Sequence, residues 1–245
     1  MITHAPKNII HRPLHPASLQ LATIMITVHH LNNSRSQRVL WLLEELEVPY
    51  EIKKYTRAPE GRAPPELLAI HPLGKSPIIT DGETTVAESG AIVEYLIQKY
   101  GSEKSTVPSS GQLDNLYYNH YAEGSLQPVL TRCEIFSKIP PAMPFFLRPI
   151  LRFVFNQVHK VLDGPELINH SKMIETHLEN RTWFAGGDHP TSADYLMGFT
   201  LEHFLSVVPE YAGPRIVEYV KRIQERPAYK HALERGGEYA FLLKN

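Results

Sequence analysis

The stretch HPLGKSPIITDGETTVAESGAIVEYL, residues 71–96, decides the fold of this chain. Two short segments rich in β-branched residues, 77–80 and 84–86, flank an Asp-Gly pair at 81–82, and this arrangement predicts a β-hairpin. Apolar residues then recur at the spacing of one helix face, namely Ile92, Val93, Leu96 and Ile97. Gly101 ends that repeat, so the stretch predicts a hairpin followed by a helix.

Upstream of the hairpin, the pattern alternates between strand and helix. Ile24–Val28 and Tyr50–Tyr55 alternate apolar and polar residues, as half-buried strands do. Between them, the residues spaced for one helix face are Val39, Leu42, Leu43 and Leu46. Pro49 stops that helix. A strand, a crossover helix, a parallel strand and a hairpin give a mixed four-stranded sheet, so residues 25–101 are predicted to form a thioredoxin-like α/β domain.

The rest of the chain shows helical spacing and no convincing strand. A polar linker, GSEKSTVPSSG at 101–111, separates it from the first domain. The Pro-rich segment 139–149 is predicted to be a loop between two helices, and Pro214 stands where a helix would begin. Residues 111–245 are therefore predicted to form an all-α domain.

The first 24 residues do not resemble part of either domain. They contain three prolines, several histidines and two other basic residues, but no acidic residue. We expect a disordered extension, or a true start at Met25. An organelle transit peptide is the alternative, although the segment lacks the Ser and Arg density of one.

Composition excludes several classes of protein. With 42% hydrophobic residues, this chain of 245 residues can form a core, which excludes wholesale disorder. Lys plus Arg is 25 and Asp plus Glu is 26, a balance unlike that of a nucleic-acid binder. Cys133 is the single cysteine, which excludes a disulfide framework and a CxxC pair and indicates a reducing, intracellular compartment. We expect Cys133 to be a small core residue.

Membrane-spanning segments and metal sites are also not predicted. The longest apolar run, 144–155, is interrupted by Arg148, Pro149 and Arg152 and is too short to cross a bilayer. The histidines are scattered without useful ligand spacing, and the motifs of nucleotide-binding and metalloprotease sites do not occur. No metal is therefore expected.

Two short motifs of the first domain could bind a ligand. Ser89 follows Glu88 at a helix start, where free N–H groups attract an anion, although an ordinary helix cap explains the pair equally well. Ser76 precedes Pro77 at the start of a strand, and a cis bond there would turn the N–H and C=O of Ser76 outward to hold an extended peptide. A simple turn is the alternative. Together these motifs suit a ligand with a carboxylate at one end and a peptide backbone in the middle.

The combination of motifs resembles a known family. VHHLNNSRSQRVLWLLEELEVPYE at 28–51 and the KSP and ES motifs of 75–89 are similar to the N-terminal domain of cytosolic glutathione S-transferases. EGSLQP at 123–128 and WFAGGDHPTSADYLMGF at 183–199 are similar to their helical domain. The resemblance covers residues 25–240 and is strongest to the fungal and bacterial branch, whose yeast member is associated with the endoplasmic reticulum.

The resemblance implies a role for each matching residue in binding glutathione. Ser76, before a cis-Pro77, would pair its backbone with the cysteinyl unit. Glu88 and Ser89 would hold the γ-glutamyl end. The residues in register with those that contact the glycyl carboxylate are Arg62, which requires a one-residue gap, and Lys75. The motif Thr191–Asp194 would form a capping box at a helix start, a structural role.

The sequence leaves open which residue activates the thiol of glutathione. Most classes have Tyr, Ser or Cys in the first loop, and here Asn33 falls at that position with Ser34 beside it. Either could donate a hydrogen bond to the thiolate, and Arg35 could add positive charge. In the second domain, Tyr117 and Tyr121 either face the acceptor pocket or pack in the core or a subunit interface.

The resemblance implies a transferase that conjugates glutathione, its co-substrate, to small hydrophobic electrophiles. Alternatives are a glutathione-dependent peroxidase or disulfide reductase, and a noncatalytic protein of the same fold that binds glutathione or carries ligands. A homodimer in the cytoplasm is expected. The segment 144–155 suggests a further, peripheral contact with the endoplasmic reticulum membrane.

Overall fold

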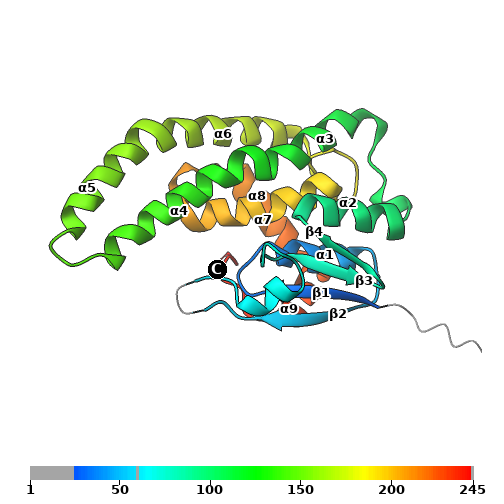
Figure 1. Ribbon diagram of the computed structural model, residues 1–245. Helices are drawn as coiled ribbons and strands as arrows, with labels where there is room; N and C mark the ends of the chain where they lie inside the picture. Colours follow the sequence, from blue (N-terminus) through cyan, green and yellow to red (C-terminus); the bar gives the residue numbers. More distant parts are fainter. Residues whose placement is uncertain (1–24, 59–60, 244–245) are drawn as a thin grey trace, which may run out of the picture.

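The computed structural model describes residues 25–58 and 61–243, which form a sheet domain beneath a larger helical domain (Figure 1). This arrangement confirms the predicted thioredoxin-like domain followed by an all-α domain. Residues 1–24 lie outside the described residues, so the expectation of a disordered extension stays a prediction.

The sheet has four strands in the order β2-β1-β3-β4. The strands are β1 (Ile26–Leu31), β2 (Tyr50–Tyr55), β3 (Ile78–Asp81) and β4 (Thr84–Ala87). β1 pairs parallel with β2, whereas β3 runs antiparallel to both β1 and β4. The mixed sheet and its hairpin are as predicted.

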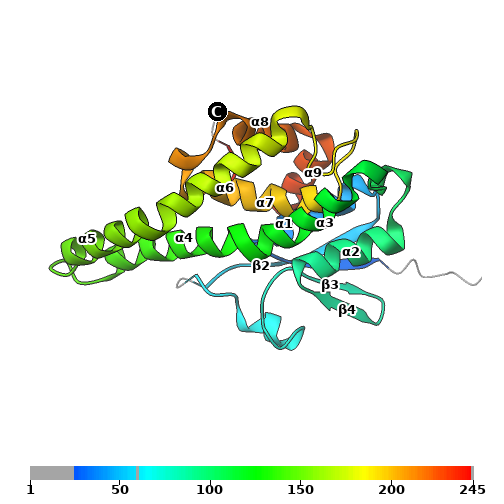
Figure 2. The same cartoon turned by 90° about the horizontal axis from the view of Figure 1, so that it is seen from above.

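Three helical segments accompany the sheet: α1 (Ser36–Glu45), η1 (Pro65–Ala69) and α2 (Ser89–Tyr100). α1 and α2 lie between the sheet and the helical domain (Figures 1 and 2). The apolar face of α1 is fully buried because it packs on β1 below and on the long helix α7 above. Burial of this kind on both sides joins the two domains into one core.

The second domain consists of helices and the loops between them in its described part. Its main helices are α3 (Gln112–Tyr121), α4 (Gln127–Ala142), α5 (Arg148–Val158), α6 (Gly164–His177), α7 (Ser192–Val207), α8 (Pro214–Glu225) and α9 (Pro227–Gly236). Single π-helical turns, η4 (Ala122–Leu126) and η5 (His159–Asp163), join α3 to α4 and α5 to α6 without a break. α8 starts at Pro214, as predicted.

The start of α7 carries the predicted capping box. The Thr191 side chain accepts from the backbone at the third helical position, and Asp194 at that position bonds back to the Thr191 N–H at 2.8 Å. The wholly buried Asp194 also accepts from the Tyr219 hydroxyl at 2.7 Å and from the Phe184 N–H at 2.9 Å. This carboxylate therefore anchors α7, the most buried helix, to α8 and to the preceding loop.

The loop predicted at 139–149 is shorter than expected. α4 continues through Pro140 and Pro141 to Ala142, and α5 already begins at Arg148. Two prolines are tolerated in this last turn because the carbonyls that they leave unbonded belong to the partly exposed Phe136 and the exposed Ser137, where water can replace the lost donors. Within the described residues, no helix is both long enough and apolar enough to cross a membrane.

Candidate active site

Ser76 is held at the edge of the sheet with its backbone outside the strand ladder. The peptide bond between Ser76 and Pro77 is cis, as the resemblance implied. The Ser76 hydroxyl donates to the His29 carbonyl at 2.9 Å, and the Leu31 N–H donates to the same hydroxyl at 3.3 Å. Since β3 begins only at Ile78, the N–H and C=O of Ser76 lie outside the pairing of β3 with β4. They are placed to bond an extended ligand.

The N-terminus of α2 lies beside Ser76. Glu88 precedes the helix with φ 73° and ψ 126°, a conformation that costs energy for any residue except glycine. The first bond of the helix runs from the Ile92 N–H to the Glu88 carbonyl, so the N–H groups of 89–91 have no partner within the helix. The alternative of an ordinary cap by Ser89 is not observed, because Glu88 holds the cap position and Ser89 is the first helical residue.

These groups line a cavity of about 410 Å³ between the domains. Its walls include Lys75, Ser76, Pro77, Glu88, Ser89, His71 and Arg35 from the first domain, and Asn119, His120 and Glu123 from the second. Free helix N–H groups and basic side chains make it suitable for an anionic ligand. We call this the polar cavity.

A second, larger cavity of about 680 Å³ adjoins the first, and both are lined by Arg35 and Ser76. Its apolar walls are Ile135, Phe199, Val207 and Phe241. Asn33, Ser34, Arg57, Glu134 and His203 are among its polar wall residues. We call this the apolar-walled cavity after these four apolar side chains, although more of its wall residues are polar or charged. A molecule extending along the cleft from the polar cavity would pass Ser76 and Arg35 before reaching it.

A partly buried group of ion pairs joins the domains at the wall of the polar cavity. Arg35 Nε donates to Glu123 Oε2 at 2.9 Å, and the Arg38 guanidinium, whose side chain is fully buried, bonds Glu123 Oε1. Arg38 also lies over the Phe199 ring, 4.8 Å from its centroid. Burial alone would raise the pKa of Glu123, but Arg38 and Arg35 hold it below its ordinary value, so the carboxylate stays ionised.

The loop before α1 presents Asn33 to the apolar-walled cavity. Asn33 has φ 49°, in the left-handed region that Asn tolerates better than most residues. Its Oδ1 accepts from the Ala240 N–H at 2.8 Å, and Arg57 donates to its carbonyl at 3.2 Å. Because the amide oxygen faces Ala240 and no group in residues 25–58 or 61–243 accepts a hydrogen bond from Nδ2, its two protons can bond a ligand.

Ser34, in contrast, is bonded within the protein. Its hydroxyl donates to the Leu31 carbonyl at 2.7 Å and accepts from the Ser36 N–H at 3.2 Å. The Ser36 hydroxyl lies 2.8 Å from the Ser34 hydroxyl and 2.9 Å from Nδ1 of His30. Burial, and secondarily the charge of Lys54, lowers the pKa of His30 to about 4, so its ring is neutral near pH 7. The single proton of the Ser34 hydroxyl is therefore already used.

Three sequence-predicted residues do not lie in the cavities. Arg62 is exposed, and Arg57 from the same loop lines the apolar-walled cavity instead. Tyr121 is buried against α6, where its hydroxyl lies 2.5 Å from His170 Nδ1, and Tyr117 donates to the sulfur of Met173 at 3.4 Å. Of the two alternatives that the sequence left open, the structure thus favours packing for these tyrosines, because they contact α6 while Asn119 and His120 of the same helix line the polar cavity.

Other wall residues were missed from the sequence. His71 lies near the KSP motif, a position that could have suggested it. His203 and Phe241 lie far along the chain from every motif, and no local pattern signals them. In the described part of the chain, the one cluster of metal-ligand side chains lies outside both cavities, between α4 and η5.

Comparison with known proteins agrees with this geometry. The family profile "Glutathione S-transferase, N-terminal domain" matches residues 24–98. "Glutathione S-transferase 3" of Schizosaccharomyces pombe is 37% identical over 217 residues, covering 86% of this chain and 88% of that protein. This chain belongs to the glutathione S-transferase family.

Two further proteins match a similar share of this transferase. "Glutathione S-transferase 1" of Saccharomyces cerevisiae is 34% identical over 224 residues, which are 86% of this chain and 95% of the yeast protein. The crystal structure of a glutathione S-transferase from Actinobacillus pleuropneumoniae superposes with a TM-score of 0.68 at 30% identity, covering 86% of this transferase and 93% of that chain. Both likenesses extend over the two domains and the cleft between them.

The group of ion pairs at the wall of the polar cavity generates a stability prediction. Glu123→Gln keeps the shape of the side chain but leaves the buried Arg38 without a carboxylate, which should lower the free energy of unfolding by about 3 kcal/mol. Urea denaturation of the purified transferase measures this loss. Glu179→Gln is the control, because Glu179 forms an exposed pair with Arg215 and should cost at most about 0.5 kcal/mol. Equal losses in the two variants would contradict the role of the buried pair.

Proposed function

We propose that this glutathione transferase binds glutathione in the polar cavity, activates its thiol with the side-chain amide of Asn33, and transfers it to a small apolar electrophile in the neighbouring cavity. The observation that carries the proposal is a contrast: the amide protons of Asn33 have no acceptor among the described residues, whereas the hydroxyl proton of Ser34 is bonded to a carbonyl. Each step uses groups that lie along one continuous cleft.

The polar cavity complements glutathione along its length. Glutathione has a carboxylate at each end and peptide groups in the middle. The backbone of Ser76 suits the cysteinyl unit, and Glu88 with the free N–H groups at the start of α2 suits the amino and carboxylate groups of the γ-glutamyl end. Lys75 and His71 supply charge and hydrogen bonds for the glycyl carboxylate.

Thiol activation requires that the thiolate be bound more tightly than the thiol. A lowering of the thiol pKa by two units corresponds to about 2.7 kcal/mol. A hydrogen bond from Nδ2 of Asn33, together with the positive charge of Arg35 in the shared wall, supplies stabilisation of that order. Glu123 neutralises part of the Arg35 charge, which makes the amide the larger contributor.

The walls of the second cavity favour conjugation. Phe199, Phe241, Ile135 and Val207 suit an apolar acceptor. Cys133 lines neither cavity and is buried, and burial raises the pKa of its thiol to about 12. Among the described residues, the cleft therefore offers no cysteine for a mixed disulfide with the protein. This favours direct attack of glutathione on the acceptor.

Replacing the amide donor should raise the pKa of the bound thiol. Asn33→Asp keeps an oxygen for the Ala240 N–H and tolerates a positive φ, but exchanges the N–H donor for a negative oxygen. We expect the pKa of bound glutathione to rise by at least about one unit and kcat/KM for a chloronitrobenzene acceptor to fall by about tenfold. Ultraviolet titration of the thiolate and steady-state kinetics measure the two effects.

Ser34→Ala is the matched control for that experiment. It removes a hydroxyl bonded to the Leu31 carbonyl, so it should lower stability by about 1 kcal/mol while leaving the thiol pKa nearly unchanged. If Ser34→Ala raises the thiol pKa and Asn33→Asp does not, the assignment to Asn33 is wrong. If neither variant changes thiol pKa or turnover, activation by this loop is refuted.

The proposal includes a homodimer that contacts its partner through α3. Leu113, Leu116 and Tyr117 are 76%, 55% and 49% exposed on this helix, an apolar surface that a partner subunit would cover. The same helix supplies Asn119 and His120 to the polar cavity, so dimerisation would place the glutathione site beside the subunit interface. This arrangement is in keeping with the family.

A charge in the α3 surface should separate the subunits. We expect Leu116→Glu to convert the dimer into a monomer, because burying a carboxylate against an apolar partner is costly. Light scattering after size-exclusion chromatography measures the mass. Val217→Glu, at a half-exposed position on α8, should leave the dimer intact. A wild-type monomer, or a dimer in both variants, would contradict the α3 interface.

The proposal also places the transferase in the cytoplasm with a peripheral membrane contact through the end of α4 and the start of α5, which projects beyond the sheet (Figures 1 and 2). Phe145, Phe146 and Phe153 are 79%, 61% and 65% exposed there. Residues 135–162 contain basic but no acidic side chains. Exposed aromatic rings beside arginines suit the interface of an anionic bilayer.

Flotation with anionic phosphatidylserine-containing vesicles tests this contact. We expect wild-type protein to float with the vesicles, and the double variant Phe145→Ser, Phe146→Ser to remain at the bottom of the gradient. Val217→Ser on α8 is the matched control and should float like wild type. Wild-type protein that stays soluble would remove the membrane proposal and leave the glutathione site untouched.

A further inference from the structure

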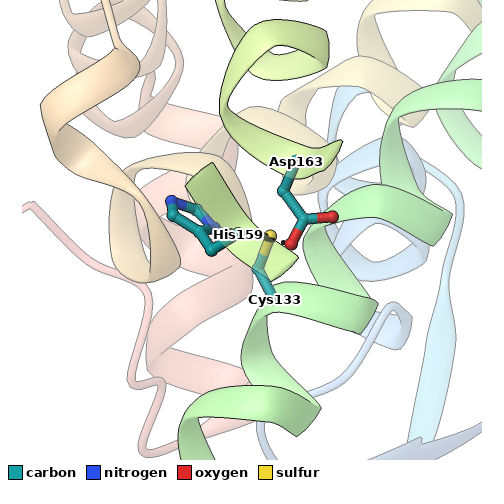
Figure 3. Close-up of side chains that lie close together, drawn as sticks. All are labelled: Cys133, His159 and Asp163. Atoms are coloured by element: carbon teal, nitrogen blue, oxygen red, sulfur yellow. Dashed lines mark hydrogen bonds and ion pairs between the residues drawn. The ribbon is translucent and has the colours of Figure 1, made fainter. Parts of the chain in front are cut away.

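Outside the cleft, Cys133 of α4 and two residues of the π-helical turn η5, His159 and Asp163, point their side chains toward one another (Figure 3). Cys133 Sγ lies 3.9 Å from His159 Nδ1, and that nitrogen lies 3.5 Å from Asp163 Oδ2. Around a tetrahedral zinc ion, thiolate, imidazole and carboxylate ligand atoms are about 3.3–3.6 Å apart. The three groups are therefore almost at the spacing of a metal triad without any movement of the backbone.

The carboxylate of Asp163 is the unexplained part of this cluster. Its side chain is wholly buried, and in the described residues the only groups close to Oδ2 are the Cys133 thiol, a weak donor to this carboxylate, and His159 Nδ1. Its other oxygen, Oδ1, accepts from Arg132 Nε at 2.7 Å. A buried carboxylate oxygen that faces only a thiol and an imidazole is poorly compensated, and a cation bound by all three groups would remove that cost.

The surroundings also orient the cluster as metal sites require. The Tyr211 hydroxyl lies 3.1 Å from His159 Nε2, so Nε2 can carry the ring proton and leave Nδ1 as an acceptor. Arg132 holds Asp163 by Oδ1 and turns Oδ2 toward Cys133 and His159, while its other end pairs with Glu166 at 2.9 Å. Hydrogen bonds of this kind, from neighbouring groups to the metal-binding side chains, fix which ring nitrogen of the histidine carries the proton and how each ligand is oriented.

The net negative charge of the cluster, with Cys133 as thiolate, would be balanced by a divalent cation. With Cys133 as thiolate, the negative groups are Cys133, Asp163 and Glu166, and the positive group bonded to them is Arg132. A divalent ion would bring this group to neutrality. The His159 side chain is 31% exposed, which gives a path for entry and a position for a water ligand.

We infer that Cys133 Sγ, His159 Nδ1 and Asp163 Oδ2 form a binding site for one borderline-soft divalent cation, with Zn²⁺ as the ion that suits this donor set. On binding, the Cys133 thiol loses its proton to solvent and its sulfur bonds the metal, with no change of oxidation state. The ion would join α4 to η5 at the base of the projecting α4–α5 pair. This metal site is separate from the glutathione cleft, so the proposed function does not depend on it.

Cobalt spectroscopy of the full-length, reduced protein tests the site directly. A thiolate bound to Co²⁺ gives a charge-transfer absorption in the near ultraviolet, and Cys133 is the single cysteine of the chain, so that band can only report Cys133. We expect the band to saturate at one Co²⁺ per chain and to disappear when Zn²⁺ is added. Cobalt bound without the band, or no saturable binding, would overturn the inference.

Isosteric variants separate the triad from the other histidines. Asp163→Asn and His159→Gln should each weaken Co²⁺ affinity by about tenfold or more, and Zn²⁺ should raise the thermal midpoint of the wild type but not of these variants. His231→Gln, on the exposed surface of α9, is the control and should leave affinity unchanged. Equal affinity in all four proteins, with folding confirmed by circular dichroism, would contradict the assigned ligands.

Discussion

The pairing of the buried Arg38 with Glu123 is the constraint on which the rest of the structure depends. Arg38 belongs to α1 of the sheet domain and Glu123 to the turn between α3 and α4, so the ion pair fixes one domain against the other at the point where the cavities meet. A buried guanidinium cannot be left without a partner, which restricts the domains to one relative position. Arg35, bonded to the same carboxylate, becomes a wall of both cavities as a result. The active site is therefore a consequence of an interdomain contact.

Much of the first domain could be predicted because its elements are determined by residues that are close together in the sequence. The Asp-Gly turn, the Pro77 position and the helix face that ends at Gly101 each depend on neighbouring residues, and the structure has them where predicted. The resemblance then assigned Ser76, Glu88 and Ser89 to one ligand, and all three line the polar cavity. The capping box of Thr191 and Asp194 was equally predictable from the sequence, since such a motif spans only four residues.

The remaining parts depend on contacts that no short window of sequence contains. Tyr117 and Tyr121 could have faced either side of α3, and Met173 and His170 on α6 decide the direction. The choice between Asn33 and Ser34 rests on the backbone of Ala240 and of Leu31, which side-chain patterns do not reveal. The alignment of His159 and Asp163 depends on a π-helical turn, which shifts the helical periodicity that sequence analysis assumes.

The bond between Asn33 and Ala240 joins residues 207 positions apart. The last described turn of the chain, with Phe241 in the cavity wall, therefore helps to shape the candidate site. A change that displaces Ala240 would remove the partner of the Asn33 amide oxygen. A substitution at Phe241 or its neighbours can therefore alter the loop proposed to activate glutathione without changing any residue of the sheet domain.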